Sequence, residues 1–261
     1  MRLTVAATAP FGADVLERLA ARYDVAALLT RPDSRAGRGR REAAPPAKLV
    51  AERLGIPVLQ PERPTAELDL PGDAVVVAAY GLLIPESLLE RGLWLNVHPS
   101  LLPRWRGAAP VERALLAGDA STGVTIHETV KELDAGPIAA QRELLLTPED
   151  DAGNVYARAA ELAVELLAEV LPSPTFRPQE GEPTYAAKIE AADRELDLDD
   201  PVDSFNRIRA LSPHIGARGE LHGRRVTIWR ARLEDGELVP LEVQPEGGRR
   251  MEYDAWLRGL R

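Results

Sequence analysis

The chain contains no cysteine and only four histidines among its 261 residues. The missing cysteines exclude disulfide bonds, thiolate metal sites and a cysteine nucleophile. Neither H-x-H nor H-E-x-x-H occurs, so we expect no metal centre. No stretch approaches the roughly 18 to 20 uncharged apolar residues of a membrane span. The opening MRLTVAATAPFGADVLERL favours a strand leading into a helix over a signal peptide. We therefore expect a cytoplasmic protein without a membrane partner.

Positive charge is scarce overall, because 32 basic residues stand against 41 acidic ones, a net charge of −9. This balance argues against non-specific binding of nucleic acid by the whole surface. Residues 31–48 depart from it, since six basic side chains there face only two acidic ones. The segment is either a solvated loop or an arm that contacts phosphates. A second basic set near the C-terminus consists of Arg218, Arg224, Arg225, Arg230 and Arg232.

Apolar runs alternate with helical patterns over the first 171 residues. Strands are predicted at 3–9, 24–30, 56–61, 73–81, 93–98, 122–130 and 138–146, and helices at 13–23, 46–55, 85–92, 110–119 and 147–171. This alternation predicts an α/β fold with a Rossmann-like, mostly parallel sheet. The first turn between strand and helix, ATAPFG, lacks G-x-G-x-x-G, so a dinucleotide site is not expected.

The clearest break in the chain is PSPTFRPQEGEP, residues 172–183, which contains four prolines. We expect a catalytic domain over 1–171, a linker over 172–183 and a small β-rich domain over 184–261. The last of these begins with a strand-like TYAAKI and a helix over 201–212, followed by short β-like runs.

Asn96 and His98 end an apolar run, LWLNVH. Residues two apart on a strand point to the same face, so these side chains converge near the carboxyl end of a parallel strand, where open α/β sheets bind ligands. Alternatively, both only satisfy buried backbone groups. Asp134 lies in a turn, ELDAGPI, where it is either an ordinary turn former or, if the turn folds back, a carboxylate beside the imidazole.

The remaining histidines and tryptophans carry weaker signals. His127 sits on a predicted strand and is interpreted as a packed histidine, and His214 and His222 as surface or turn residues. The loop PSLLPRWRGAAP after His98 is suited to lining a pocket for a flat ligand, although Trp105 is equally interpretable as a buried anchor of the loop. Trp229 and Trp256 are predicted to belong to a local core.

NVHPSLLPRWRGAAP, followed by LDAGPI, resembles the folate-dependent formyltransferase family. Further similar segments are RPDSRAGRGRR, VVVAAYGLLIP, AGDASTGVTI, TYAAKI and LEVQP, which together cover most of the chain. The RWRGAAP and AGRG segments resemble the branch that formylates methionyl-initiator tRNA for translation initiation. The resemblance implies 10-formyltetrahydrofolate as the formyl donor and co-substrate, no metal, and a C-terminal domain like a shortened OB barrel. We expect a monomer.

The resemblance also implies roles for individual residues. Asn96 would hold the oxyanion, His98 would donate to it or relay protons, and Asp134 would orient His98. The folate pocket would be lined by Ser100, Leu101, Leu102, Pro103, Tyr80, Gly81 and Leu82, and tRNA would contact Arg31, Arg35, Arg38, Arg40 and Arg41.

Three alternatives remain open from the sequence. A formyltransferase that acts on a small amine, such as an amino sugar nucleotide, would keep Asn96, His98 and Asp134 but would have little need of a basic arm. A non-catalytic RNA-binding module would not need these three residues. A hydrolase that transfers the formyl group to water would explain neither basic set.

Overall fold

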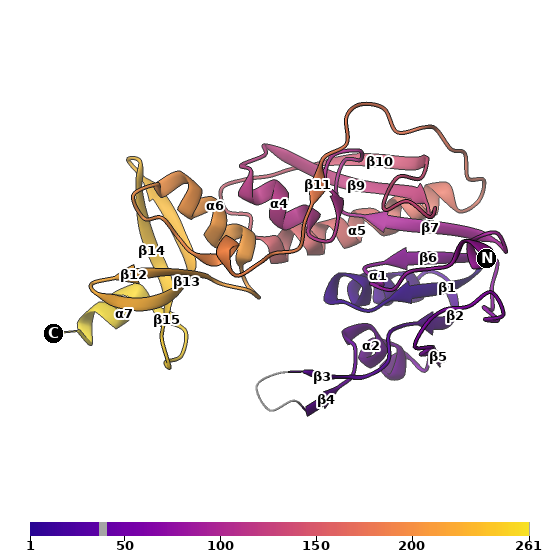
Figure 1. Ribbon diagram of the computed structural model, residues 1–261, viewed down its shortest axis with the longest axis horizontal. Coiled ribbons are helices and arrows are strands. Elements are labelled where there is room, and N and C mark those ends of the chain that lie inside the picture. The colour runs from indigo at the N-terminus through magenta and orange to yellow at the C-terminus, as the bar shows by residue number, and fades with distance from the viewer. Residues whose placement is uncertain (37–40, 261) are drawn as a thin grey trace. The chain divides into compact units, whose positions relative to one another are not determined.

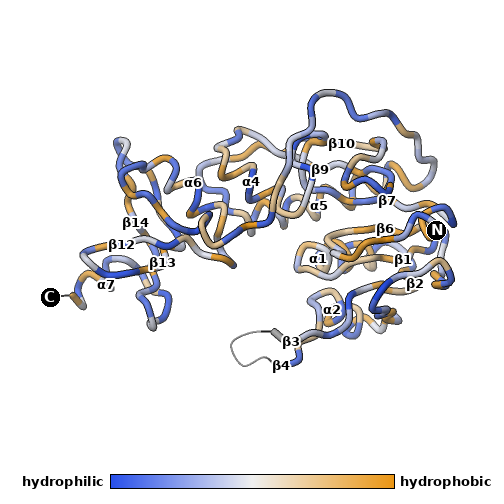
Figure 2. Tube along the Cα trace, in the orientation of Figure 1, coloured by the Kyte–Doolittle hydropathy of each residue, from blue (hydrophilic) through white to orange (hydrophobic). Residues whose placement is uncertain are grey.

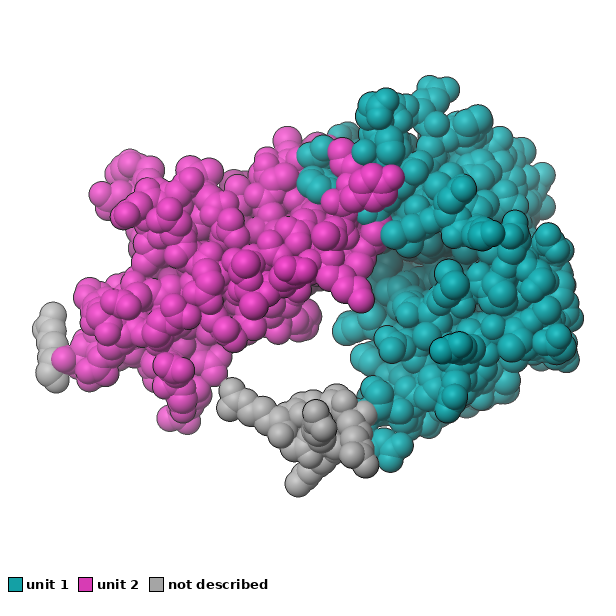
Figure 3. Space-filling model, viewed as in Figure 1, with its two compact units in different colours: residues 1–106, 123–143, 157–183 teal, residues 107–122, 144–156, 184–261 magenta. Residues whose placement is uncertain are grey.

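The computed structural model describes residues 1–36 and 41–260. They form two compact units (Figure 3). Unit 1 comprises residues 1–106, 123–143 and 157–183, and unit 2 comprises 107–122, 144–156 and 184–261. The segment 172–183 thus falls at the end of unit 1. The division into a catalytic domain, a linker and a C-terminal domain stays a prediction.

The main sheet has seven strands in the order β10-β9-β7-β6-β1-β2-β5, which follow one another from top to bottom in Figure 1. Their bounds are β1 (Arg2–Ala7), β2 (Asp24–Leu29), β5 (Val58–Leu59), β6 (Ala74–Ala78), β7 (Leu93–His98), β9 (Ser121–Glu128) and β10 (Ile138–Leu145). Neighbours from β7 to β5 are parallel, and β9 is antiparallel to β7. The predicted mostly parallel sheet is therefore confirmed.

The helices of the α/β part are α1 (Pro10–Ala20), α2 (Pro46–Leu54), α3 (Glu86–Leu89), α4 (Pro110–Leu116) and α5 (Ala152–Val170). A Cβ on Gly12 would lie 2.2 Å from the carbonyl oxygen of Ala78, so only glycine allows α1 to approach β6 this closely. Helix α2 ends at Gly55, which is left-handed as a C-terminal cap. Helix α5 starts later than predicted, because the Asp151 side chain accepts the backbone N–H of Asn154 and caps it.

Strand β6 is buried along its whole length, and Figure 2 shows it as a mostly hydrophobic stretch of the chain. This is expected of a parallel strand that is covered on both faces. The strand ends at Ala78 rather than at residue 81, because Ala79 has a positive φ of 47° and turns the chain away from the sheet.

The basic segment of residues 31–48, interpreted as a solvated loop or an arm, contains a short antiparallel hairpin of β3 (Ser34–Ala36) and β4 (Arg41–Ala43). Strands of three residues with few apolar side chains have no hydrophobic periodicity, so the pattern did not reveal them.

Unit 2 contains a sheet in the order β12-β13-β14-β15 that packs on two helices. The bounds are η1 (Ala192–Arg194), α6 (Pro201–Leu211), β12 (Ala217–Leu221), β13 (Arg224–Glu234), β14 (Glu237–Pro245), β15 (Met251–Glu252) and α7 (Tyr253–Arg258). Its core includes Ile208, Ile228, Val243 and, as predicted, Trp256. Strands β8 (Arg106–Gly107) and β11 (Tyr185–Ala186) form a separate pair. The predicted β-rich C-terminal part is confirmed, and its likeness to an OB barrel stays a prediction.

Within the described ranges, no helix is long and apolar enough to cross a membrane.

Candidate active site

The carboxyl end of β7 carries Asn96 and His98 on one face of the sheet. Strand β9 pairs beside it in antiparallel register, which places His127 opposite Asn96 and Thr125 opposite His98. Directly paired residues of neighbouring strands project to the same side. The antiparallel partner therefore adds a second imidazole to the pair that the sequence predicted.

Asp134 folds back onto this face from the turn between β9 and β10. Its Oδ1 accepts a hydrogen bond from Asn96 Nδ2 at 3.2 Å. Its Oδ2 lies 3.6 Å from His98 Nδ1, and its Oδ1 lies 3.7 Å from His127 Nε2. The three side chains that the sequence singled out thus lie together, and Asp134 is only 8% exposed. Charges in such a buried site are screened much less by solvent than charges on the surface.

His98 is held in one orientation by the loop that follows it. Its Nε2 lies 2.8 Å from the backbone oxygen of Trp105, and since a carbonyl can only accept, Nε2 must carry the hydrogen. Trp105 adopts a left-handed conformation with φ of 65°, which is uncommon outside glycine. The Ser100 hydroxyl donates to the carbonyl of Arg104 at 2.6 Å and secures the same loop. The free nitrogen of His98, Nδ1, therefore faces Asp134.

His127 is packed, as predicted, but it also lies beside Asp134. Its Nδ1 lies 2.8 Å from the Glu128 carbonyl, so Nδ1 donates and Nε2 is left as an acceptor. That Nε2 has no hydrogen-bond partner among the residues that the structure describes. Burial, together with the charge of His98, lowers the pKa of His127 to about 4. His127 is therefore neutral at physiological pH.

No motif in the sequence indicates that His127 belongs to this site. A single histidine on an apolar strand is more often a core residue than a catalytic one. The antiparallel pairing of β9 with β7 joins residues far apart in the sequence. Knowledge of that register alone would have revealed His127.

Of residues 100–103, which are predicted to line the folate pocket, two are buried in the core and two are not. Ser100 and Leu102 are buried. Thr125 Oγ1 donates to the Ser100 carbonyl at 2.7 Å, and Gln141 Nε2 donates to the Leu102 carbonyl at 2.9 Å. Leu101 and Pro103 are half-buried, so they are the members of this group that remain accessible to a ligand.

The loop after β6 likewise contains both buried and accessible residues. Tyr80 is only 2% exposed and packs in the core cluster with Val77 and Trp94. Burial raises its pKa to about 12. Gly81 and Leu82 are more accessible, and Leu83 is 82% exposed. Tyr80 therefore offers a ligand little surface, since its ring is buried and its carbonyl accepts a hydrogen bond from the Thr8 hydroxyl at 2.7 Å.

The predicted basic arm is described only in part. Arg31 is exposed, and the backbones of Arg35 and Arg41 lie in β3 and β4. Arg38 and Arg40 lie outside the described residues.

A polar cluster holds the base of this arm. Asp33 accepts hydrogen bonds from Lys48 Nζ at 2.7 and 2.8 Å and from Gln60 Nε2 at 2.8 Å. Gln60 also donates to the Arg31 carbonyl. The hydrogen bonds from Gln60 and Lys48 lower the pKa of Asp33. Lys48 is thus neutralised locally and does not add to the charge that the arm presents.

The second basic set is largely paired with carboxylates in unit 2. Arg225 lies 3.0 Å from Glu195, Arg230 lies 3.7 Å from Glu252, and Arg232 lies 2.9 Å from Glu234. Its local charge is therefore much less positive than the arginine count suggested. Exposed pairs of this kind are weak, so these arginines can still exchange partners.

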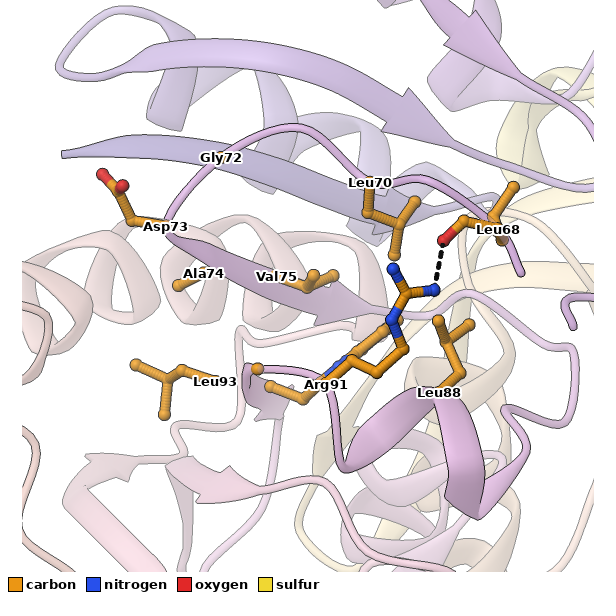
Figure 4. Close-up of a pocket in the computed structure, with 11 residues that line it drawn as sticks. Leu68, Leu70, Gly72, Asp73, Ala74, Val75, Leu88, Arg91 and Leu93 are labelled. Carbon is orange, nitrogen blue, oxygen red and sulfur yellow. Dashed lines mark hydrogen bonds between the residues drawn. The ribbon is translucent and has the colours of Figure 1, made fainter. Parts of the chain in front are cut away.

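A cavity in unit 1 lies away from the cluster of Asn96 and His98. It is lined by residues at the beginnings of β6 and β7, including Ala74 and Leu93 (Figure 4). Arg91 spans it and donates to the carbonyls of Ala66 and Leu68. Asn96, His98 and Asp134 gather instead at the carboxyl end of β7, where ligands of open α/β sheets bind. No group of three or more potential metal-ligating side chains was found in the described part of the chain.

Comparisons with known proteins assign the chain to a family. Residues 1–171 match the family model described as formyl transferase. The chain belongs to the formyl transferase family.

The relatives narrow this class to one kind of enzyme. The chain is 39% identical to the methionyl-tRNA formyltransferase of Paracoccus denitrificans, with 100% of this chain and 98% of the relative covered. It is also 39% identical to the methionyl-tRNA formyltransferase of Thermus thermophilus, with coverages of 99% and 96%. The solved methionyl-tRNA formyltransferase of Clostridium thermocellum has a TM-score of 0.67 at 18% identity, covering 94% of this chain and 98% of that one. This last likeness shows the fold alone.

Proposed function

We propose that the protein transfers a formyl group from 10-formyltetrahydrofolate to the amino group of methionyl-initiator tRNA. The observation that carries this proposal is the convergence of Asn96, His98 and Asp134 at the carboxyl end of β7. Full-length similarity to methionyl-tRNA formyltransferases supports the choice of acceptor. A solved structure of HypX from Aquifex aeolicus in complex with tetrahydrofolic acid has a TM-score of 0.62 and shares the fold at 17% identity.

Asn96 is the proposed donor to the oxyanion. An asparagine amide carries two hydrogens, and one of them is donated to Asp134 Oδ1. The other is free to bind the oxygen that becomes negative when the amine attacks the formyl carbon. A single preorganised donor of this kind contributes about 10²- to 10³-fold to the rate.

His98 is the proposed proton carrier. The new bond joins the acceptor nitrogen to the formyl carbon, and the bond from that carbon to N10 of the folate breaks. The acceptor nitrogen must lose a proton and N10 must gain one. Because Nε2 is committed to Trp105, the exchange uses Nδ1, which faces Asp134 at 3.6 Å. A positioned acid–base group contributes about 10²- to 10⁴-fold, and the Asp134 carboxylate stabilises the imidazolium that forms transiently.

The remaining predicted residues are assigned to the two substrates within this proposal. The accessible members of the predicted folate pocket, Leu101, Pro103, Gly81 and Leu82, are proposed to contact the folate. The arm with Arg31, Arg35, Arg38, Arg40 and Arg41 is proposed to contact tRNA phosphates, where each neutralised phosphate adds salt dependence. The unit with β12 to β15 is proposed to support tRNA binding. An enzyme that formylates initiator tRNA acts where translation starts, so we propose that the protein is cytoplasmic. We also propose that it is a monomer.

The test is to mix purified protein, 10-formyltetrahydrofolate and methionine-charged initiator tRNA, and to look for formyl-methionine. We expect product with the wild type and formation about 10²- to 10⁴-fold slower with His98→Ala. An amino sugar nucleotide serves as the competing acceptor. Formylation of that amine without formylation of the tRNA would overturn the proposed acceptor and retain the chemistry. The KM for tRNA should rise steeply with salt, whereas a small acceptor would give a flat response.

A further inference from the structure

The segment after α5 approaches the Asp134 turn in a defined register. Arg177 and Ile138 exchange both backbone hydrogen bonds, at 2.7 and 2.9 Å, as an antiparallel bridge. In antiparallel pairing each step forward on one strand meets a step back on the other. Residue 179 is therefore brought opposite residue 136, two positions from Asp134. All of these residues belong to unit 1.

Gln179 binds the backbone of that turn. Its Nε2 donates to the carbonyl of Asp134 at 2.8 Å and to that of Gly136 at 2.9 Å. Its Oε1 accepts from Arg106 Nε at 3.1 Å and from Nη2 at 2.6 Å. The two amide hydrogens and both acceptor positions of the oxygen are thus used. The orientation of the amide is unambiguous, because a flipped amide would set its NH₂ against the guanidinium and its oxygen against two carbonyls.

The turn needs such support. Asp134 is held at a φ of 49°, a left-handed conformation that is uncommon for residues other than glycine. Two hydrogen bonds to the carbonyls on either side of Ala135 oppose relaxation of that turn. Arg106 in turn directly follows Trp105, whose carbonyl holds His98 Nε2. The same short loop therefore locates His98 and, through Gln179, Asp134.

We propose that Gln179, held by Arg106, is a positioning residue that sets the Asp134 carboxylate against His98 and Asn96. This inference rests on the formyl transfer proposed above. Gln179 touches neither the reacting atoms nor the three side chains themselves. It acts through the backbone of the turn.

Kinetics of three variants and one control variant form the first part of the test. Gln179→Ala removes all four hydrogen bonds, and we expect kcat to fall about 10- to 100-fold, since misplacement of a reacting group by about 1 Å has costs of this size. The KM values should stay near those of the wild type. Gln179→Glu keeps an acceptor for Arg106 but lacks the donors to the turn, so it should be as impaired as Gln179→Ala. Arg106→Met should lower kcat by a smaller factor than Gln179→Ala. Its matched control is Arg142→Met, because Arg142 is an exposed arginine with two ion pairs.

A histidine spectrum forms the second part and does not depend on turnover. The chain has only four histidines, so its ring ¹⁵N signals can be assigned individually. In Gln179→Ala we expect the signals of His98 and His127 to shift, and those of His214 and His222 to stay in place. A wild type that transfers no formyl group would refute the proposed function, yet these shifts would still show that Gln179 positions the turn.

Two results would overturn the inference. One is a folded Gln179→Ala protein with the wild-type kcat and unchanged His98 and His127 signals. The other is full rescue by Gln179→Glu, which would show that only the contact with Arg106 matters. If Gln179→Ala does not fold, Arg106→Met decides the question, because unshifted histidine signals and an unchanged kcat in that variant would equally count against the inference.

Discussion

Gly136 is the position where one added methyl group should displace the Asp134 turn. A Cβ built there would lie 1.8 Å from the Glu128 carbonyl oxygen and 3.3 Å from His127 Nδ1. Real Cβ atoms almost never come within 3.0 Å of another heavy atom, so the turn or the end of β9 must move by at least 1.2 Å. Either movement separates Asp134 from His98 or shifts His127.

The Gly136→Ala variant should therefore lose about 100-fold in kcat, the size expected when a reacting group is misplaced by about 1 Å. Steady-state kinetics with charged tRNA measure kcat, and circular dichroism checks that the variant is folded. Gly92→Ala is the control, because a Cβ there meets nothing within 4 Å and its φ is not left-handed. A folded Gly136→Ala enzyme with the wild-type kcat would refute the claim that the position of the turn controls the chemistry.

Three further changes have expected outcomes. Asn96→Ala should lower kcat by about 10²- to 10³-fold, because the oxyanion loses its proposed donor. Single-turnover rates at saturating folate measure the chemical step directly, and a smaller loss there would contradict the proposed role. Burial lowers the pKa of His127 to about 4, below its ordinary value of about 6.5. Its contribution to stability is therefore complete above pH 6.5 and is lost as the pH falls towards 4. Urea unfolding of His127→Gln should show a weaker decline over that range than the wild type, and equal declines would contradict the assignment. Burial raises the pKa of Glu112, so its ionisation in the folded state weakens stability as the pH rises through and above the unfolded value. Glu112→Gln, which keeps an acceptor for the Tyr156 hydroxyl, should melt at a higher temperature than the wild type at pH 8 and show no such gain at pH 3. A lower melting temperature at pH 8 would contradict it.

The pair of Asn96 and His98 could be predicted because it depends only on the two-residue period of a strand. Its position at the carboxyl end followed from the alternation of strands and helices, which predicts parallel pairing. Asp134 was named from its turn, but its approach to His98 was conditional on how the turn folded. The structure shows that fold, with the Asp134 carboxylate accepting a hydrogen bond from Asn96.

His127 and Gln179 could not be predicted as neighbours of the site. Each reaches it through an antiparallel pairing, β9 with β7 in one case and Arg177 with Ile138 in the other. Such pairings join residues far apart in sequence, and no local propensity encodes them. Gln179 also lay in a proline-rich stretch interpreted as a linker, where single polar side chains carry no periodic signal.

The cluster of Asp33, Lys48 and Gln60 separates the hairpin of β3 and β4 from the rest of unit 1. It anchors the residues that enter and leave the hairpin of β3 and β4 to the body of unit 1. We therefore expect changes in the sequence between those strands to leave β2 and the proposed formyl-transfer site undisturbed. Grafting a hairpin of different length or charge onto this base offers a route to new acceptors while the catalytic residues stay untouched.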